Sequence, residues 1–544
     1  MHKWVGQLLL PEGVAGLLSP AGHERAGGTR RNHRRELRRP TASLVPEIFL
    51  IDVTRTGRME YLNMSTTRPT SSSSRTATGT TSPSDSHEKA KAPSIPDDMG
   101  QVRPDPARNG YIGRIVAGSL AAGVVAALLL VAAPFIQAQE DDITGAVLCG
   151  FALGWAMLAV LSVRFTDQPQ RWAVVPAFFM GVSGLLLVAF GSGVSDALQW
   201  IWPPALLALA IWMTLQARRQ LHSRTRRWLL YPVIAVMALA SVGGGYETVR
   251  EHLDASAYPV TGRLIDVGGY RLHIHCTGSG SPTVVLEPGG GDMSSAMGWI
   301  APAVAEHTRV CVYDRAGRGW SDPSGSTQDG EQIATDLHTL LHRAHVPGPY
   351  VLAGHSFGGL YVRIFAARYP NEVAGMVLID STGSTLPVST SAQSWGPDDI
   401  LARASVLAST LARLGVGRLI GLGGGYGSLP PRSADEVRAK IATSTSLRST
   451  IDEFLQASAS EHEAASLTDF GDKPLVVLTA ESGSNAAWMA AQDKTATLST
   501  NSAHRVVDGA SHPDLILKHA DAAVTAQAII DVVSSVRSNP PLVK

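Results

Sequence analysis

Residues 350–364 read YVLAGHSFGGLYVRI, and this stretch decides the fold of the C-terminal half of the chain. The apolar residues 350–353 predict a buried strand, and residues 359–364 predict a helix that begins directly after it. Between them lies a G-x-S-x-G pattern, in which a sharp turn lifts the Ser356 hydroxyl above the sheet. Glycine two positions before and after the serine removes side chains that would clash there. Ser356 is therefore a candidate nucleophile on a strand-to-helix elbow.

Short apolar segments on both sides of this elbow predict a mostly parallel sheet. They alternate with Gly-rich turns and helical stretches, which is the pattern of βαβ units. Helices are expected over residues 332–345, after Ser356, and over residues 520–533. Eight strands are expected over residues 263–267, 270–275, 283–286, 309–313, 350–353, 376–379, 475–478 and 504–507.

A serine hydroxyl needs a base, and on this type of elbow the partners follow in the order Ser, acid, His. His512 comes after the last expected strand and before the final helix, in a loop from which an imidazole reaches back to the elbow. His512 is therefore the predicted base, because His504 begins a strand and His519 falls in a helix. Structural or surface roles are expected for His338, His342, His345 and His355.

From roughly residue 260 to 533 the chain resembles the α/β-hydrolase superfamily. Besides the elbow, YDRAGRGWSD at residues 313–322 is similar to the turn after strand four in esterase-like and iminopeptidase-like members. The resemblance implies an α/β fold, with an eight-stranded sheet and a helical lid, and a serine hydrolase of the carboxylesterase or lipase type that acts on ester or related acyl bonds. Asp314 is expected to pin the turn.

The loop after the third strand departs from the family pattern. Residues 287–291 read EPGGG where many members carry a His-Gly oxyanion loop. Backbone N–H groups form an oxyanion hole, so the substitution need not abolish it. By position, the predicted donors are the N–H groups of Gly289 and Phe357, with Gly290 as the alternative. The other interpretation of the glycine run at residues 289–291 is a plain tight turn with no role in binding an oxyanion.

Two carboxylates compete for the role of triad acid. The usual family position after strand seven offers Glu481, whereas another branch of the superfamily places the acid after strand six, where this chain has Asp380. Either carboxylate would orient His512 and stabilise its imidazolium. Asp380 is preferred and Glu481 is the alternative acid. The remaining candidates are Asp493, Asp508 and Asp514.

A mostly helical insertion over residues 381–473 is expected to form the lid, with helices at 400–414 and 434–457 and a Gly-rich segment between them. The insertion has few charges, and its helices carry rows of Leu, Val and Ile, which favours an uncharged or amphipathic substrate. Ordinary packing between helices explains these apolar rows equally well. A peptidase of the iminopeptidase type would need lid acids to hold a free amine. The lid acids are Asp398, Asp399, Asp452 and Glu453.

Five apolar runs without charges precede this domain, and each is long enough to span a bilayer. They cover residues 115–136, 143–163, 172–190, 197–215 and 228–246. No ionisable residue lies inside them, so an anchor is expected and transport is not. Lys and Arg gather in alternate loops, which predicts a cytoplasmic N-terminus, with everything after residue 246 outside the cell membrane.

Three regions follow from these patterns. Residues 1–110 are expected to be a disordered cytoplasmic region, in which Met59 and Met64 are usable alternative starts. Residues 111–246 are expected to be a multi-pass membrane region, and residues 247–544 a hydrolase domain with its lid at about 381–473.

Charge and composition exclude several classes of function. Lys+Arg and Asp+Glu number 46 each, and this balance argues against a nucleic-acid binder. Three cysteines exclude a disulfide-built scaffold. The superfamily's strand order makes Cys276 and Cys311 antiparallel neighbours, which leaves open either a disulfide or two buried thiols. Neither a cofactor nor a metal is expected, because the chain shows no metal cluster, P-loop or dinucleotide fingerprint.

The expected partners are a small acyl or ester substrate, with a lipid among the candidates, and membrane lipids. The alternative from another class of function is a non-catalytic, hydrolase-like module that binds a lipid or a partner protein.

Overall fold

The computed structural model describes residues 111–137, 139–166, 168–220, 224–381, 397–538 and 541–542. These residues fall within one compact unit. The expected disordered region at residues 1–110 lies outside the described residues.

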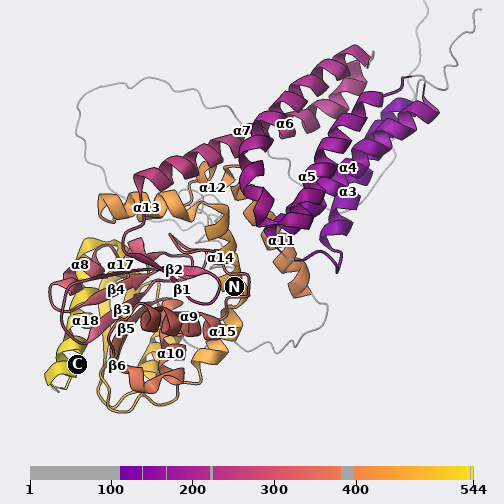
Figure 1. The fold of residues 1–544 in the computed structure, drawn as a ribbon. Coiled ribbons are helices and arrows are strands. Elements are labelled where there is room, and N and C mark those ends of the chain that lie inside the picture. The colour runs from indigo at the N-terminus through magenta and orange to yellow at the C-terminus, as the bar shows by residue number, and fades with distance from the viewer. Residues whose placement is uncertain are drawn as a thin grey trace, which may run out of the picture. The chain divides into compact units, whose positions relative to one another are not determined.

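Eight strands form one sheet in the order β1-β2-β4-β3-β5-β6-β7-β8, and the strands from β4 to β8 in this order run parallel (Figure 1). Only β1 with β2 and β2 with β4 pair antiparallel. The predicted eight-stranded, mostly parallel sheet is thus confirmed. The strands are β1 (Arg263–Asp266), β2 (Arg271–Thr277), β3 (Thr283–Glu287), β4 (Val310–Tyr313), β5 (Tyr350–His355), β6 (Val373–Ile379), β7 (Leu475–Ser482) and β8 (Ser502–Ser511).

Both faces of the sheet are buried, which explains why its central strands read as continuous apolar runs. Alternate residues point to opposite faces, so Val285 packs with one core cluster while Val284 and Leu286 pack with the other. The first cluster includes helices α9 (Gly330–Arg343), α10 (Gly358–Arg368) and α15 (Ala457–Ala464). The second includes α8 (Ile300–Ala305), α17 (Asp514–Leu517) and α18 (His519–Ser538).

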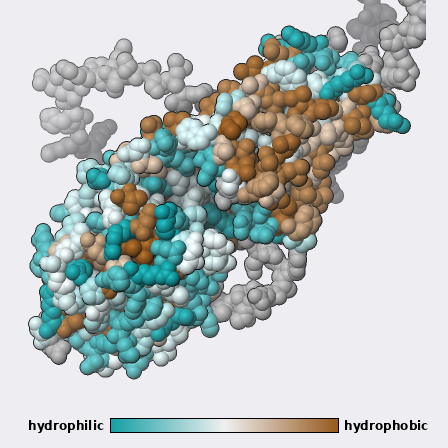
Figure 2. Space-filling view, viewed as in Figure 1, coloured by the Kyte–Doolittle hydropathy of each residue, from teal (hydrophilic) through white to brown (hydrophobic). Residues whose placement is uncertain are grey.

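Five described helices are long and apolar enough to cross a membrane, as expected. Figure 2 shows the hydrophobic surface gathered over helices α3 to α6. The structure corrects two of the expected ends. The first helix stops at Val131, shortly before Pro134, and the fifth continues beyond Tyr246 to Ala257. The five are α3 (Tyr111–Val131), α4 (Glu140–Phe165), α5 (Val174–Phe190), α6 (Ser192–Gln220) and α7 (Arg224–Ala257), with the short η2 (Arg171–Ala173) before α5.

The lid is helical, but the single helix expected over residues 434–457 is wrong. Thr443 leaves the helical conformation, and its side chain accepts a hydrogen bond from the Ser446 N–H, so it ends one helix and caps the next. The described lid elements are α11 (Pro397–Ala412), α12 (Val416–Leu419), η5 (Gly424–Tyr426), α13 (Pro431–Ile441) and α14 (Ser444–Leu455), followed by α15.

Ion pairs join the lid to two of the five long apolar helices. Arg418 of α12 lies 2.9 Å from Glu247 and 3.0 Å from Asp254, both on α7. The side chain of Ser444 at the start of α14 donates to Glu140 of α4, and Arg413 pairs with the same carboxylate. The lid is therefore attached to charged segments of both helices.

Cys276 and Cys311 form a disulfide, which resolves the choice between a bridge and two thiols. The two residues lie directly opposite each other on the antiparallel strands β2 and β4, with their Cα atoms 4.0 Å apart.

Candidate active site

Ser356 occupies the turn between β5 and α10, with its backbone in the left-handed region at φ 52°. A side chain on either flanking glycine would collide with backbone. A Cβ at Gly354 would lie 2.4 Å from the Gly358 carbonyl oxygen, and a Cβ at Gly358 would lie 2.4 Å from that of Glu287. The Ser356 N–H donates to the Ile379 carbonyl at 3.0 Å, which ties the turn to the end of β6. The elbow is thus held by close backbone packing.

Asp380 follows β6 at the same edge of the sheet, and it also has a left-handed backbone, at φ 42°. Its Oδ2 lies 2.6 Å from Nδ1 of His512, which follows β8. Its Oδ1 accepts a hydrogen bond of 2.8 Å from the indole N–H of Trp488 on α16 (Ala486–Ala496). The carboxylate is therefore buried and held at both oxygens, an arrangement that fixes the ring of His512.

The other carboxylates considered for the acid have different partners. Glu481 accepts a hydrogen bond of 2.9 Å from the backbone N–H of Gly509. Asp493 pairs with Nδ1 of His504, and Asp514 accepts from Ser511. Asp508 lies within β8.

His355, next to the nucleophile candidate, is buried and neutral at physiological pH. Burial lowers the pKa of His355 to about 3, and the nearby His512 contributes to the lowering. Its Nε2 lies 3.2 Å from the carbonyl oxygen of His512, and the two rings are 4.6 Å apart between centroids. His355 thus supports the backbone that carries His512, which agrees with the structural role expected for it.

The loop at residues 289–291 passes directly over the elbow. A Cβ at Gly289 would lie 3.4 Å from the Cβ of Ser356, and a Cβ at Gly290 would lie 2.8 Å from the ring of Phe357. Within the described part of the chain, the backbone N–H groups of Gly289 and Phe357 have no hydrogen-bond acceptor. Both predicted oxyanion donors are therefore near the serine and unused by the fold.

Arg315, from the turn after β4, holds this loop in place. Its guanidinium donates to the side chain of Glu287 at 2.5 Å and to the carbonyl oxygens of Pro288 and Gly289 at 2.8 and 2.6 Å. Tyr313 donates to the second oxygen of Glu287. Burial raises the pKa of Glu287 to about 7, although the charge of Arg315 opposes that shift. The Glu-Pro departure from the family pattern is thus part of a buried ion pair.

The same guanidinium reaches the lid through Glu453 of α14. Arg315 lies 2.8 Å and Arg318 3.0 Å from this carboxylate, which also accepts a hydrogen bond of 2.9 Å from the Gly291 N–H. Burial alone would raise the pKa of Glu453, but the charges of Arg315 and Arg318 hold it below its ordinary value. Glu453 is therefore ionised at neutral pH. It joins helix α14 to the turn after β4 and to the loop after β3.

Asp314 accepts a hydrogen bond of 3.2 Å from the backbone N–H of Trp320, which agrees with the role expected for it in this turn. Its two oxygens lie 2.8 Å from Nδ1 of His273 and 2.7 Å from the N–H of Ser294.

Sequence analysis missed the contacts of Trp488, Arg315 and Glu453. Arg315 belongs to the YDRAGRGWSD stretch that carries the family resemblance, and that stretch does not by itself indicate a contact with the lid. Glu453 was considered only as a binder of a free amine. Nothing in the sequence around Trp488 indicates a contact with Asp380.

We expect Glu453→Gln to destabilise the chain by about 3 kcal/mol, because two buried arginines would lose the charge that compensates theirs. The thermal unfolding midpoint of the protein in detergent should fall by roughly 5 to 10 °C.

Asp452→Asn is the matched control, since the neighbouring Asp452 pairs with Arg448 at the partly exposed surface of the same helix. Equal shifts for the two variants would contradict the role assigned to Glu453.

Three comparisons place these observations among known proteins. Residues 282–519 match the family model described as alpha/beta hydrolase fold. The 2-hydroxymuconate semialdehyde hydrolase of Pseudomonas sp. (strain CF600) is 29% identical over 132 residues, which are 24% of this chain and 47% of that protein. An uncharacterized vacuolar membrane protein of Saccharomyces cerevisiae (strain YJM789) is 30% identical over 130 residues, which are 21% of this chain and 20% of that protein.

Among solved structures, the enol-lactonase from Burkholderia xenovorans LB400 is similar with a TM-score of 0.38 and 21% identity, over 50% of this chain and 100% of that one. The chain spans less than half the length of the curated relatives that it matches. The domain that follows the five apolar helices therefore has the α/β-hydrolase fold.

Proposed function

We propose that this protein is a membrane-anchored serine hydrolase that cleaves ester or related acyl bonds on the extracytoplasmic side. One observation carries the proposal: a buried carboxylate, Asp380, lies 2.6 Å from His512 at the sheet edge where the elbow presents Ser356. A nucleophile, an acid and a base that follow β5, β6 and β8 at one sheet edge are the arrangement that acyl transfer requires.

Each group has a defined task in this reaction. With its Nδ1–H donated to Asp380, the ring of His512 has Nε2 free of a proton, and this nitrogen removes the proton of Ser356 as the oxygen attacks the carbonyl carbon. The N–H groups of Gly289 and Phe357 stabilise the oxyanion. His512 then returns the proton to the leaving alcohol. Water, deprotonated by the same ring, hydrolyses the acyl-enzyme and restores Ser356.

The partners of the carboxylates support Asp380 as the acid. Glu481 is engaged by a backbone N–H of the neighbouring strand and is exposed. Asp380 has the burial, the second donor in Trp488 and the contact with His512 that an orienting acid needs.

The lid contacts favour an ester over a free N-terminal amine. A peptidase of the iminopeptidase type needs a carboxylate that is free to bind the amine. Glu453 is buried between two arginines, and Asp452 pairs with Arg448. The side chains of Asp398 and Asp399 lie outside the described residues.

The disulfide supports the proposed side of the membrane. Bridges of this kind persist in oxidising compartments and are rare in the cytosol. Cys276 and Cys311 are bridged, and the loops rich in Lys and Arg predict the same orientation.

Ion pairs attach the lid to α4 and α7, two of the proposed membrane helices. This attachment favours a substrate that reaches the site from the lipid phase.

A membrane-impermeant fluorophosphonate probe tests chemistry and orientation together. We expect the probe to label intact cells that express the wild type, and Ser356→Ala to abolish the label, because the probe phosphonylates an activated serine oxygen. Ser326→Ala, at an exposed serine, is the control and should label normally.

Labelling only after solubilisation would contradict the orientation. A folded protein that resists the probe in both settings would favour the non-catalytic binding module.

Three variants test the acid with a soluble activated ester. Asp380→Asn should lower kcat by about 10³-fold or more, because the His512 ring loses its orientation and the stabilisation of its charge. Trp488→Phe should lower kcat about tenfold with little change in KM, since one hydrogen bond to the carboxylate is lost. Glu481→Gln should leave kcat within about twofold. A large loss in Glu481→Gln with an active Asp380→Asn would reverse the assignment.

A further inference from the structure

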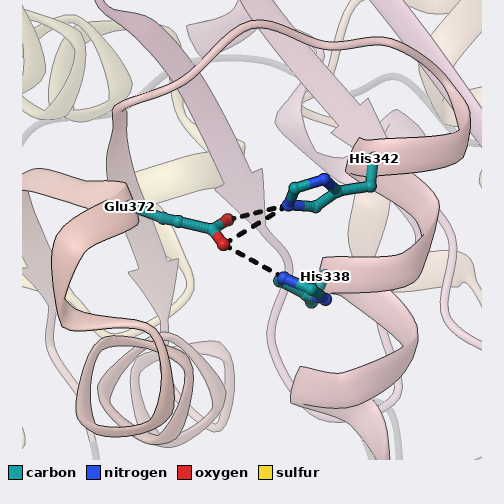
Figure 3. A group of neighbouring side chains, drawn as sticks. All are labelled: His338, His342 and Glu372. Atoms are coloured by element: carbon teal, nitrogen blue, oxygen red, sulfur yellow. Dashed lines mark hydrogen bonds and ion pairs between the residues drawn. The ribbon is translucent and has the colours of Figure 1, made fainter.

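Three potential metal ligands converge on the surface of the hydrolase domain, away from the candidate active site. His338 and His342 lie four residues apart on one face of α9, and Glu372 ends the short helix η4 (Pro370–Glu372) (Figure 3). Nε2 of His338 lies 3.0 Å from Oε1 of Glu372, and Nε2 of His342 lies 3.3 Å from each oxygen. The three ligand atoms all lie within 4.8 Å of one another.

We propose that His338, His342 and Glu372 bind a divalent transition metal of the zinc type. Zinc binds imidazole nitrogen and carboxylate oxygen at about 2.0 to 2.2 Å, so ligand atoms of a tetrahedral site lie about 3.3 Å apart. The nitrogen-to-oxygen distances of 3.0 and 3.3 Å already match that spacing. The ion therefore fits with small side-chain adjustments.

Hydrogen bonds between the two imidazoles and the Glu372 carboxylate leave these groups incompletely satisfied. A neutral imidazole has one N–H, yet Nε2 of His342 lies equally far from both oxygens of Glu372, and Oε1 also faces His338. The distance of 3.3 Å is longer than the usual 2.9 to 3.0 Å of an N–H···O bond. One cation at the centre would replace these shared contacts with three directed bonds.

The surroundings hold one ligand in place before metal binds. The ring of His338 stacks on Tyr369, with 3.9 Å between centroids and 10° between planes. This contact orients Nε2 toward Glu372, while the side chain of His342 is 57% exposed and leaves an approach for the ion and for a further ligand such as water.

The location defines what the ion would do. Glu372 directly precedes β6, whose opposite end leads into Asp380. A strand of this length places the cluster roughly 20 Å from the catalytic edge, too far for direct participation in the reaction. The metal would join α9 to the start of β6, and its effect would appear as stability.

Zinc binding by the full chain is the test, with protein purified in detergent without a polyhistidine tag and treated with a chelator. We expect one zinc per chain in a competition titration with a chromophoric chelator. Zinc at a hundredfold excess over its Kd should raise the thermal unfolding midpoint by roughly 5 °C. Magnesium at the same concentration should leave the midpoint unchanged, because it prefers oxygen ligands.

Two variants and a control localise the site. His342→Gln and Glu372→Gln should each weaken zinc binding tenfold or more and remove the rise in midpoint. His307→Gln changes an exposed histidine outside the cluster. This variant should bind zinc as the wild type does and should show the same rise in the thermal unfolding midpoint. If a variant fails to fold, the wild type and the other variant still decide the question. Absence of zinc binding by the wild type, or equal binding by wild type and His342→Gln, would overturn the proposal.

Discussion

A buried guanidinium group holds the candidate active site together. Arg315 contacts Glu287, two carbonyl oxygens of the loop that passes over Ser356, and Glu453 of the lid. Charges removed from water are tolerated only when they are paired and hydrogen-bonded, so each of these groups depends on the others. The loop after β3, the turn after β4 and helix α14 must therefore fold together. The loop that carries Gly289, a predicted oxyanion donor, gains a fixed position from this arrangement, which is what electrostatic stabilisation of a transition state requires.

The parts predictable from sequence are those governed by local pattern. Short apolar segments and Gly-rich turns predicted the eight strands, because the central strands are buried and turn residues bound the strands. The elbow around Ser356 carries its own geometric requirement, since Gly354 and Gly358 leave no room for a side chain. His512 was found from the order in which such residues follow one another. Its contact with Asp380 agrees with the preferred acid.

The parts that escaped prediction depend on contacts between distant segments. Asp380 follows β6, and Glu481 lies near the end of the neighbouring parallel strand β7, so sequence alone left both available to His512. Trp488 reaches Asp380 across 108 positions, and Glu453 reaches Arg315 across 138. Glu372 lies 30 positions from His342, so the three ligands of the proposed metal site form no local sequence motif. Helix ends were misplaced for a related reason: Thr443 begins a new helix through a cap, and α7 continues past its apolar part because its charged residues pair with the lid.

In the proposed mechanism Ser356 forms a covalent acyl-enzyme. The most direct measurement is mass spectrometry of the purified protein, quenched with acid within milliseconds to seconds of mixing with an activated ester and then digested. The peptide containing Ser356 should gain the mass of the acyl group and lose it as turnover is completed. Hydrolysis of the ester without an adduct on that peptide would contradict covalent catalysis by Ser356. An adduct elsewhere that persists in Ser356→Ala would contradict it as well.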